Sequence, residues 1–208
     1  MDNLVWIDCE MTGLDLAHDA LIEVAVVITD AELNPLDDGV DVVIAPPPEA
    51  VTAMGDFVRQ MHTNSGLIDQ LADGLSLAEA ETKLMAYIRQ HIPEPDKAPL
   101  CGNTISTDRN FLKRDLPELE GYLHYRNIDV SSLKELVRRW YPRVFFSAPD
   151  KTGNHRALGD ILDSITELRY YRQTVFTTQP GPSRDQAADI ARQLSAPPEP
   201  APPAIATP

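Results

Sequence analysis

Residues 4–10 decide the fold, and they read Leu4-Val5-Trp6-Ile7-Asp8-Cys9-Glu10. Branched and aromatic side chains of this kind pack well on a pleated sheet, so the stretch predicts a β-strand. Side chains two positions apart on a strand share a face, which places Asp8 beside Glu10. Such a pair is more often a solvated pair at a strand end than a ligand site. Inside an apolar strand, however, two unpaired charges are costly, and this favours a role as paired oxygen ligands.

The segments that follow predict the rest of the sheet. Apolar runs over residues 21–29 and 39–44 with short links indicate an antiparallel meander with the first strand. Further strands are expected over 99–102 and 126–130, and helices over 76–91, 106–114, 131–140 and 157–176. Ser76 and Glu79 have the spacing of a capping box, and Ser131 is the expected N-cap of its helix. We therefore predict an α/β fold, with a mixed sheet of about five strands flanked by helices.

Composition divides the chain into a folded part and a tail. The 208 residues are 43% hydrophobic and 24% charged, which is typical of a globular protein. We expect one domain over residues 1–178 and a disordered tail rich in Pro and Ala over 179–208. No apolar run approaches the roughly 20 residues that span a bilayer, and the N-terminus lacks the basic region of a signal peptide. We thus expect a cytoplasmic protein in which Cys9 and Cys101 are buried, reduced thiols.

The formal net charge is −14, which restricts the class of substrate. Proteins that hold long DNA or RNA normally carry a basic face, because phosphate neutralisation supplies most of their affinity. An acidic chain therefore argues against a long polymer as the main ligand. A small anionic substrate is still compatible, since bound divalent cations can reverse the local field.

Three more residues complete a candidate acidic site. Asp108 follows a strand and a Gly turn, where it could equally support the first turn of a helix through the helix dipole. His155 and Asp160 are five residues apart, about 140° around a helix, so they could meet only if His155 precedes the helix. Otherwise they are a surface histidine and a solvated acid, and Asp163 is a rival to Asp160.

Clustered carboxylates repel one another and have raised pKa values unless a cation neutralises them. Oxygen ligands suit Mg²⁺ or Mn²⁺. Two such ions can clamp the attacking and leaving oxygens of a phosphodiester. A neutral histidine nearby can take a proton from the attacking water.

Three segments carry a resemblance to a known family. Residues 8–15 read DCEMTGLD, residues 102–112 read GNTISTDRNFL, and His155 is followed by four residues and Asp160. In this order they resemble the three motifs of the DEDDh exonuclease superfamily, and specifically its oligoribonuclease branch, over residues 4–176.

The resemblance implies a ribonuclease-H-like fold, a homodimer, and 3′→5′ hydrolysis of very short RNA oligonucleotides, especially dinucleotides, to 5′-mononucleotides. It implies that two divalent ions are held by Asp8, Glu10, Asp108 and Asp160, with His155 as general base. Substrate-binding positions carried over from the family are Leu14, Phe57, His62, Thr104, Tyr125, Arg126 and Ser131.

The family assigns Leu14 to a wedge between bases and Phe57 to base stacking, and Phe57 stands where Trp is frequent. His62 and Thr104 match phosphate contacts, and Thr104 stands where Ser is common. Tyr125, Arg126 and Ser131 match positions that the partner subunit contributes around a 5′-phosphate. Tyr125 could instead be interface packing and Ser131 only an N-cap. Gly159 also departs from the Asp or Ala often found there.

Three alternatives remain open at this level. The chain could be a 3′→5′ exonuclease that acts on single-stranded DNA, or a metal-dependent phosphatase of small phosphorylated metabolites. It could also be an inactive nucleic-acid-binding dimer, although all five catalytic positions are intact.

Overall fold

The computed structural model describes residues 3–151, 153 and 155–195. The chain divides into two compact units, with the boundary between Val175 and Phe176. The first unit contains a five-stranded sheet in the order β3-β2-β1-β4-β5. Its strands are β1 (Leu4–Met11), β2 (Leu21–Thr29), β3 (Val40–Val43), β4 (Pro99–Gly102) and β5 (His124–Asp129).

The sheet is mixed, as the sequence predicts. Strands β1, β2 and β3 pair antiparallel as a meander, whereas β4 pairs parallel with β1 and with β5. Strand β1 is central, with β2 on one side and β4 on the other. The predicted α/β class is therefore confirmed.

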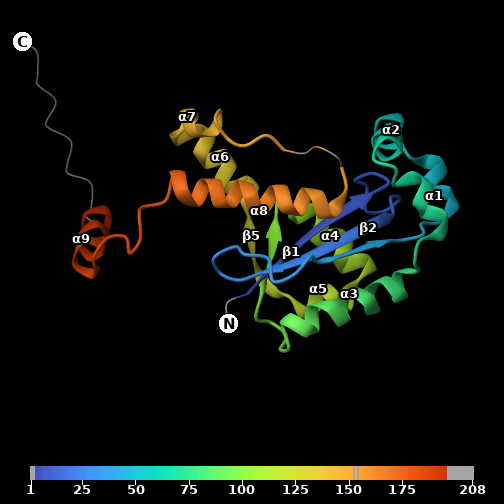
Figure 1. Ribbon diagram of the computed structural model, residues 1–208, viewed down its shortest axis with the longest axis horizontal. Coiled ribbons are helices and arrows are strands. Elements are labelled where there is room, and N and C mark those ends of the chain that lie inside the picture. Colours follow the sequence, from blue (N-terminus) through green and yellow to red (C-terminus); the bar gives the residue numbers. More distant parts are fainter. Residues whose placement is uncertain (1–2, 152, 154, 196–208) are drawn as a thin grey trace, which may run out of the picture. The chain divides into compact units, whose positions relative to one another are not determined.

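Helices cover both faces of the sheet (Figure 1). On one face, Ile7 and Cys9 of β1 share a core cluster with residues of α3 (Leu77–His91), α4 (Ser106–Asp115) and α5 (Pro117–Tyr122). On the other face, Trp6 packs with residues of α6 (Val130–Trp140) and α8 (Ala157–Thr174). Asp8 and Glu10 alternate with Ile7 and Cys9, so they lie on the face that α8 covers. Both cysteines are buried and free, as predicted.

Some helices were not predicted from the sequence. They are α1 (Pro48–Ala53), α2 (Asp56–Asn64), the 3₁₀ helix η1 (Ile68–Asp73), α5 and α7 (Pro142–Phe145). Helix α2 buries only His62, and α1 only Ala50; both are short, so each offers few apolar residues from which a helix is read in the sequence. The capping box of Ser76 and Glu79 is present.

The predicted cap of α6 was wrong. The helix begins at Val130, and Asp129 is its N-cap, since the Asp129 carboxylate accepts a hydrogen bond from the Ser131 backbone N–H. The Ser131 hydroxyl donates to the same Asp129 oxygen. Asp129 has the extended backbone of an N-cap residue, whereas Ser131 lies within the helix, so the backbone geometry places the cap at Asp129.

The second unit contains α9 (Arg184–Ser195), whose side chains are all exposed. Residues 196–208 lie outside the described residues, so the disorder expected for 179–208 stays a prediction, as does the boundary at residue 178. Within the described part of the chain, no helix combines the length and the apolar character needed to cross a membrane.

Candidate active site

Three carboxylates meet where β1 runs beneath the start of α8. Oxygen atoms of Asp8, Glu10 and Asp160 all lie within 4.8 Å of one another. Asp8 and Glu10 share a face of β1, as expected, and Asp160 lies in the first turn of α8. Residues about 150 positions apart in the chain thus form one group of oxygen atoms.

Asp108 reaches the same strand from the first turn of α4. Its side chain is buried, and its Oδ1 accepts a hydrogen bond of 3.0 Å from the Cys9 backbone N–H, between Asp8 and Glu10. Asp108 therefore contacts β1, and its role is not limited to stabilising the first turn of α4. The Asp108 charge raises the pKa of both Asp8 and Glu10.

Burial and mutual repulsion disfavour ionisation throughout this group. Burial, followed by the charges of neighbouring acids, raises the pKa of Glu10 to about 8 and that of Asp8 well above its usual range. Burial also raises the pKa of Asp108 to about 6, and it raises the pKa of Asp160. A divalent cation would offset both costs, and a donor set made only of carboxylate oxygens fits a hard ion such as Mg²⁺ or Mn²⁺. These residues therefore fit a divalent-metal site.

His155 precedes α8, as its spacing from Asp160 required. The helix begins at Ala157, and His155 is exposed on the preceding loop with a φ of 49°, in the left-handed region. A protonated His155 would lower the pKa of Asp160, opposite to the effect of burial. The loop, and not the helix, brings the histidine to the acidic group.

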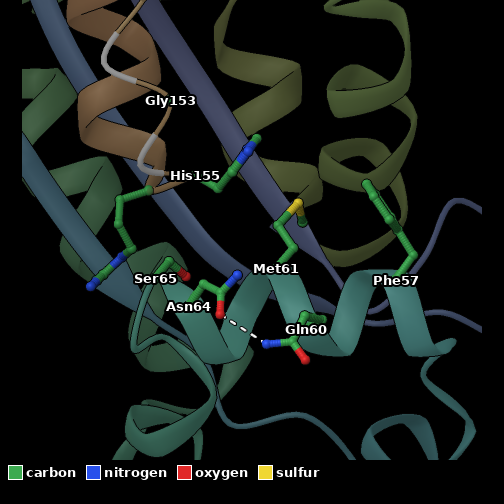
Figure 2. Close-up of a pocket in the computed structure, with 8 residues that line it drawn as sticks. Phe57, Gln60, Met61, Asn64, Ser65, Gly153 and His155 are labelled. Carbon is green, nitrogen blue, oxygen red and sulfur yellow. Dashed lines mark hydrogen bonds between the residues drawn. The ribbon is translucent and has the colours of Figure 1, made fainter.

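A pocket of about 550 Å³ lies between α2 and the loop that carries His155. Figure 2 shows Phe57 and Met61 rising from α2 on the side where His155 lies. The Gln60 side-chain amide donates a hydrogen bond of 2.8 Å to Asn64 Oδ1. The pocket is lined by Phe57, Gln60, Met61, Asn64, Ser65, Gly153, His155 and Arg156. The exposed ring of Phe57 offers a flat apolar face to an occupant of this pocket.

The other sequence-predicted positions lie in four different settings. Leu14 is exposed on the loop after β1, whereas His62 is fully buried, with its Nε2 2.9 Å from the Met11 carbonyl oxygen. Among the described residues, His62 Nδ1 has no hydrogen-bond partner.

Tyr125, Arg126, Thr104 and Ser131 do not line the pocket beside His155. Tyr125 and Arg126 lie on the edge strand β5. The guanidinium carbon of Arg126 lies 5.6 Å from the centroid of the Tyr125 ring. The Thr104 backbone N–H donates to Ser131 Oγ at 3.2 Å, so these two residues form a separate group.

Sequence comparison identifies the family. The exonuclease family RNase_T matches residues 5–168. The oligoribonuclease of Streptomyces griseus is 65% identical over 199 residues, which cover 96% of this chain and 99% of the relative. This chain belongs to the oligoribonuclease family of exonucleases. The oligoribonuclease of Streptomyces coelicolor is 62% identical over 91% of this chain and 95% of its own length.

Solved structures show the same fold at lower identity. Exonuclease I from Methylocaldum szegediense has a TM-score of 0.59 at 22% identity, and the match covers 92% of this chain and 46% of that chain. E. coli Exonuclease I in complex with a dA16 oligonucleotide has a TM-score of 0.65 at 14% identity, over 84% of this chain and 42% of that one. The oligoribonuclease-family chain thus spans less than half of these larger exonucleases. It is itself an exonuclease, a phosphodiester hydrolase, with the same fold.

One buried residue beside this site was missed in the sequence analysis. Glu23 of β2 is fully buried and lies opposite Glu10 in the sheet register. The signal was present, because an acid within the otherwise apolar run of 21–29 is as costly as Asp8 is within β1.

Proposed function

We propose that this chain is a 3′→5′ exoribonuclease that hydrolyses very short RNA oligonucleotides, down to dinucleotides, to 5′-mononucleotides. The observation that carries the proposal is the group of Asp8, Glu10 and Asp160 oxygens within 4.8 Å, next to the exposed His155. The identity of 65% with a protein named oligoribonuclease supports the choice of short RNA.

Asp8, Glu10, Asp108 and Asp160 would hold two divalent cations, Mg²⁺ or Mn²⁺. When bound, such ions neutralise charge on the phosphodiester and favour its attack by water. The chain's carboxylates must then be ionised, which the repulsion within the group opposes until the cations are bound.

His155 would act as general base. It accepts a proton from the attacking water as the new P–O bond forms and the bond from phosphorus to the 3′-oxygen breaks. The departing 3′-oxygen takes up a proton from solvent, and the products are a 5′-mononucleotide and a shortened chain with a 3′-hydroxyl. Because His155 is exposed, the proton that it accepts can leave directly to solvent.

Substrate recognition would use exposed apolar groups and a few donors. Phe57, 81% exposed, would stack on a base, and Leu14, 74% exposed, would wedge between bases. Thr104 would contact phosphate, whereas the fully buried His62, with its Nε2 against the Met11 carbonyl oxygen, does not reach phosphate in this conformation.

A homodimer would place the Tyr125, Arg126 and Ser131 of one subunit around the 5′-phosphate held by the other. Exposed Trp140 and Phe146 support such an interface. A site closed in this way needs no basic groove, which is consistent with the net charge of −14. The cytoplasmic location stays a prediction.

The test is to follow 5′-labelled RNA of two to ten nucleotides with the wild-type chain, Asp160→Asn and Asp163→Asn. We expect the fastest cleavage on the shortest RNAs and a loss of roughly 1,000-fold or more for Asp160→Asn, because a ligand charge is removed. Asp163→Asn, one turn further along α8, is the matched control and should retain activity.

Other outcomes would overturn the proposal. Faster cleavage of long RNA or of DNA would favour a different exonuclease substrate. Release of phosphate from mononucleotides would indicate a phosphatase, and an active Asp160→Asn would exclude this site.

A further inference from the structure

Glu23 is a buried acid with both carboxylate oxygens engaged. It lies opposite Glu10 in the β1–β2 register, so the two side chains share the sheet face that α8 covers. Glu23 Oε1 accepts a hydrogen bond of 2.7 Å from Arg156 Nε, and its Oε2 accepts one of 2.9 Å from the Ala157 backbone N–H. A fully buried carboxylate is tolerated when it is paired in this way.

These contacts hold the start of α8. The residue at its N-cap position, Arg156, makes no side-chain capping hydrogen bond, so the helix's first N–H group, at Ala157, needs another acceptor. Glu23 supplies that acceptor from a strand 134 residues earlier in the chain. Its negative charge also suits the positive end of the helix dipole.

Arg156, which is bound by Glu23, also contacts two further elements. Its Nη2 lies 3.5 Å from Asp41 Oδ2 on β3 and 3.4 Å from Gln70 Oε1 on η1. The guanidinium therefore joins α8 to β2, β3 and η1. Its orientation is determined by several partners at once.

His155 immediately precedes these two anchored residues. Its φ of 49° lies in the left-handed region, which side chains other than Gly adopt rarely and which persists where the surrounding structure enforces it. Gly153, two residues earlier, also has a positive φ of 62°. The contacts of Glu23 with Arg156 and Ala157 help to fix the backbone on the helix side of His155.

We propose that Glu23 is a positioning residue for the reaction, acting through Arg156 and Ala157 to hold His155 beside the acidic group. This inference rests on the proposed role of His155 as general base. Glu23 does not act as a metal ligand, since both of its carboxylate oxygens are occupied by Arg156 and Ala157.

The experiment compares Glu23→Gln with wild type by steady-state kinetics on an RNA dinucleotide, by Mn²⁺ titration and by thermal unfolding. Glutamine keeps the size of the side chain but replaces one acceptor with a donor and removes the charge. At saturating Mn²⁺ we expect kcat to fall roughly 10- to 100-fold, while KM changes by less than about twofold. Glu32→Gln is the matched control, because it breaks an exposed ion pair of 2.5 Å with Arg172 elsewhere on α8.

A double variant separates positioning from a purely structural role. If Glu23 acts through His155, then Glu23→Gln should cause no further loss of kcat in a His155→Ala background. Should Glu23→Gln fold poorly, Arg156→Lys, which keeps the charge but loses the Nε–H donor, should give the same loss of kcat and the same absence of loss in His155→Ala.

The outcomes distinguish this inference from the function on which it rests. Full activity of His155→Ala would contradict the proposed general base. An inactive His155→Ala together with a fully active Glu23→Gln would overturn only the positioning role. An equal loss of kcat in the wild-type and His155→Ala backgrounds would also overturn it, since Glu23 would then act on the fold or on the acidic group.

Discussion

Removing divalent cations should make the folded chain less stable as the pH rises, and Glu10 should be a main cause. Glu10 is 8% exposed, and burial together with the charges of Asp160 and Glu23 raises its pKa from 4.5 to about 8. The native state therefore keeps a proton that the unfolded chain releases above its ordinary pKa. Stability is then lost progressively as the pH rises from 4.5 towards 8.

The size of the effect follows from that difference in pKa. Each pKa unit corresponds to about 1.4 kcal/mol, so Glu10 alone should lower the free energy of unfolding by about 3 kcal/mol between pH 5.5 and pH 8. Cations bound by the ionised group offset this loss. Their stabilising effect should grow with pH, because binding releases protons.

Urea denaturation at pH 5.5 and pH 8, in EDTA and in saturating Mn²⁺, measures these quantities. Glu10→Gln is the control, since glutamine does not titrate and should remove most of the pH dependence seen in EDTA. Metal-free stability that is equal or higher at pH 8, or a Glu10→Gln variant with the wild-type dependence, would refute this account of the acidic group.

Four further predictions test recognition, assembly and the helix cap. Arg126→Ala should weaken binding of a 5′-phosphorylated dinucleotide roughly 10-fold, through loss of a charge-assisted hydrogen bond, while kcat is kept; equal affinity in a titration would exclude that role. Phe57→Ala should raise KM roughly 10-fold and Phe57→Trp should not, because stacking needs an aromatic face; an unchanged KM for the alanine variant would contradict stacking. Trp140→Glu should give a monomer in sedimentation and lower activity, and an active dimer would place the interface elsewhere. Asp129→Ala should cost about 1 kcal/mol in urea denaturation, more than Ser131→Ala, and the reverse order would return the cap to Ser131.

Local patterns were sufficient where burial follows a regular period. The alternation in β1 predicted both the strand and the shared face of Asp8 and Glu10, and the apolar run of 21–29 predicted β2. Such patterns failed for α1 and α2, which lie on the surface and bury few apolar side chains. The cap of α6 was also misassigned, because Asp129 and Ser131 both have side chains suited to an N-cap and only the backbone geometry distinguishes them.

For the candidate site, too, some features were predictable from the sequence and others only from the tertiary structure. By itself, the sequence determined which residue types are available, the order of the three motifs and the need for His155 to precede its helix. Only the tertiary structure decided that Asp160 meets Asp8 and Glu10, and that Glu23 holds the backbone beside His155. The reason is physical: a strand pattern fixes which way a side chain points. Which distant helix closes over it depends on β1 lying between β2 and β4 and on the packing of α8 across that face.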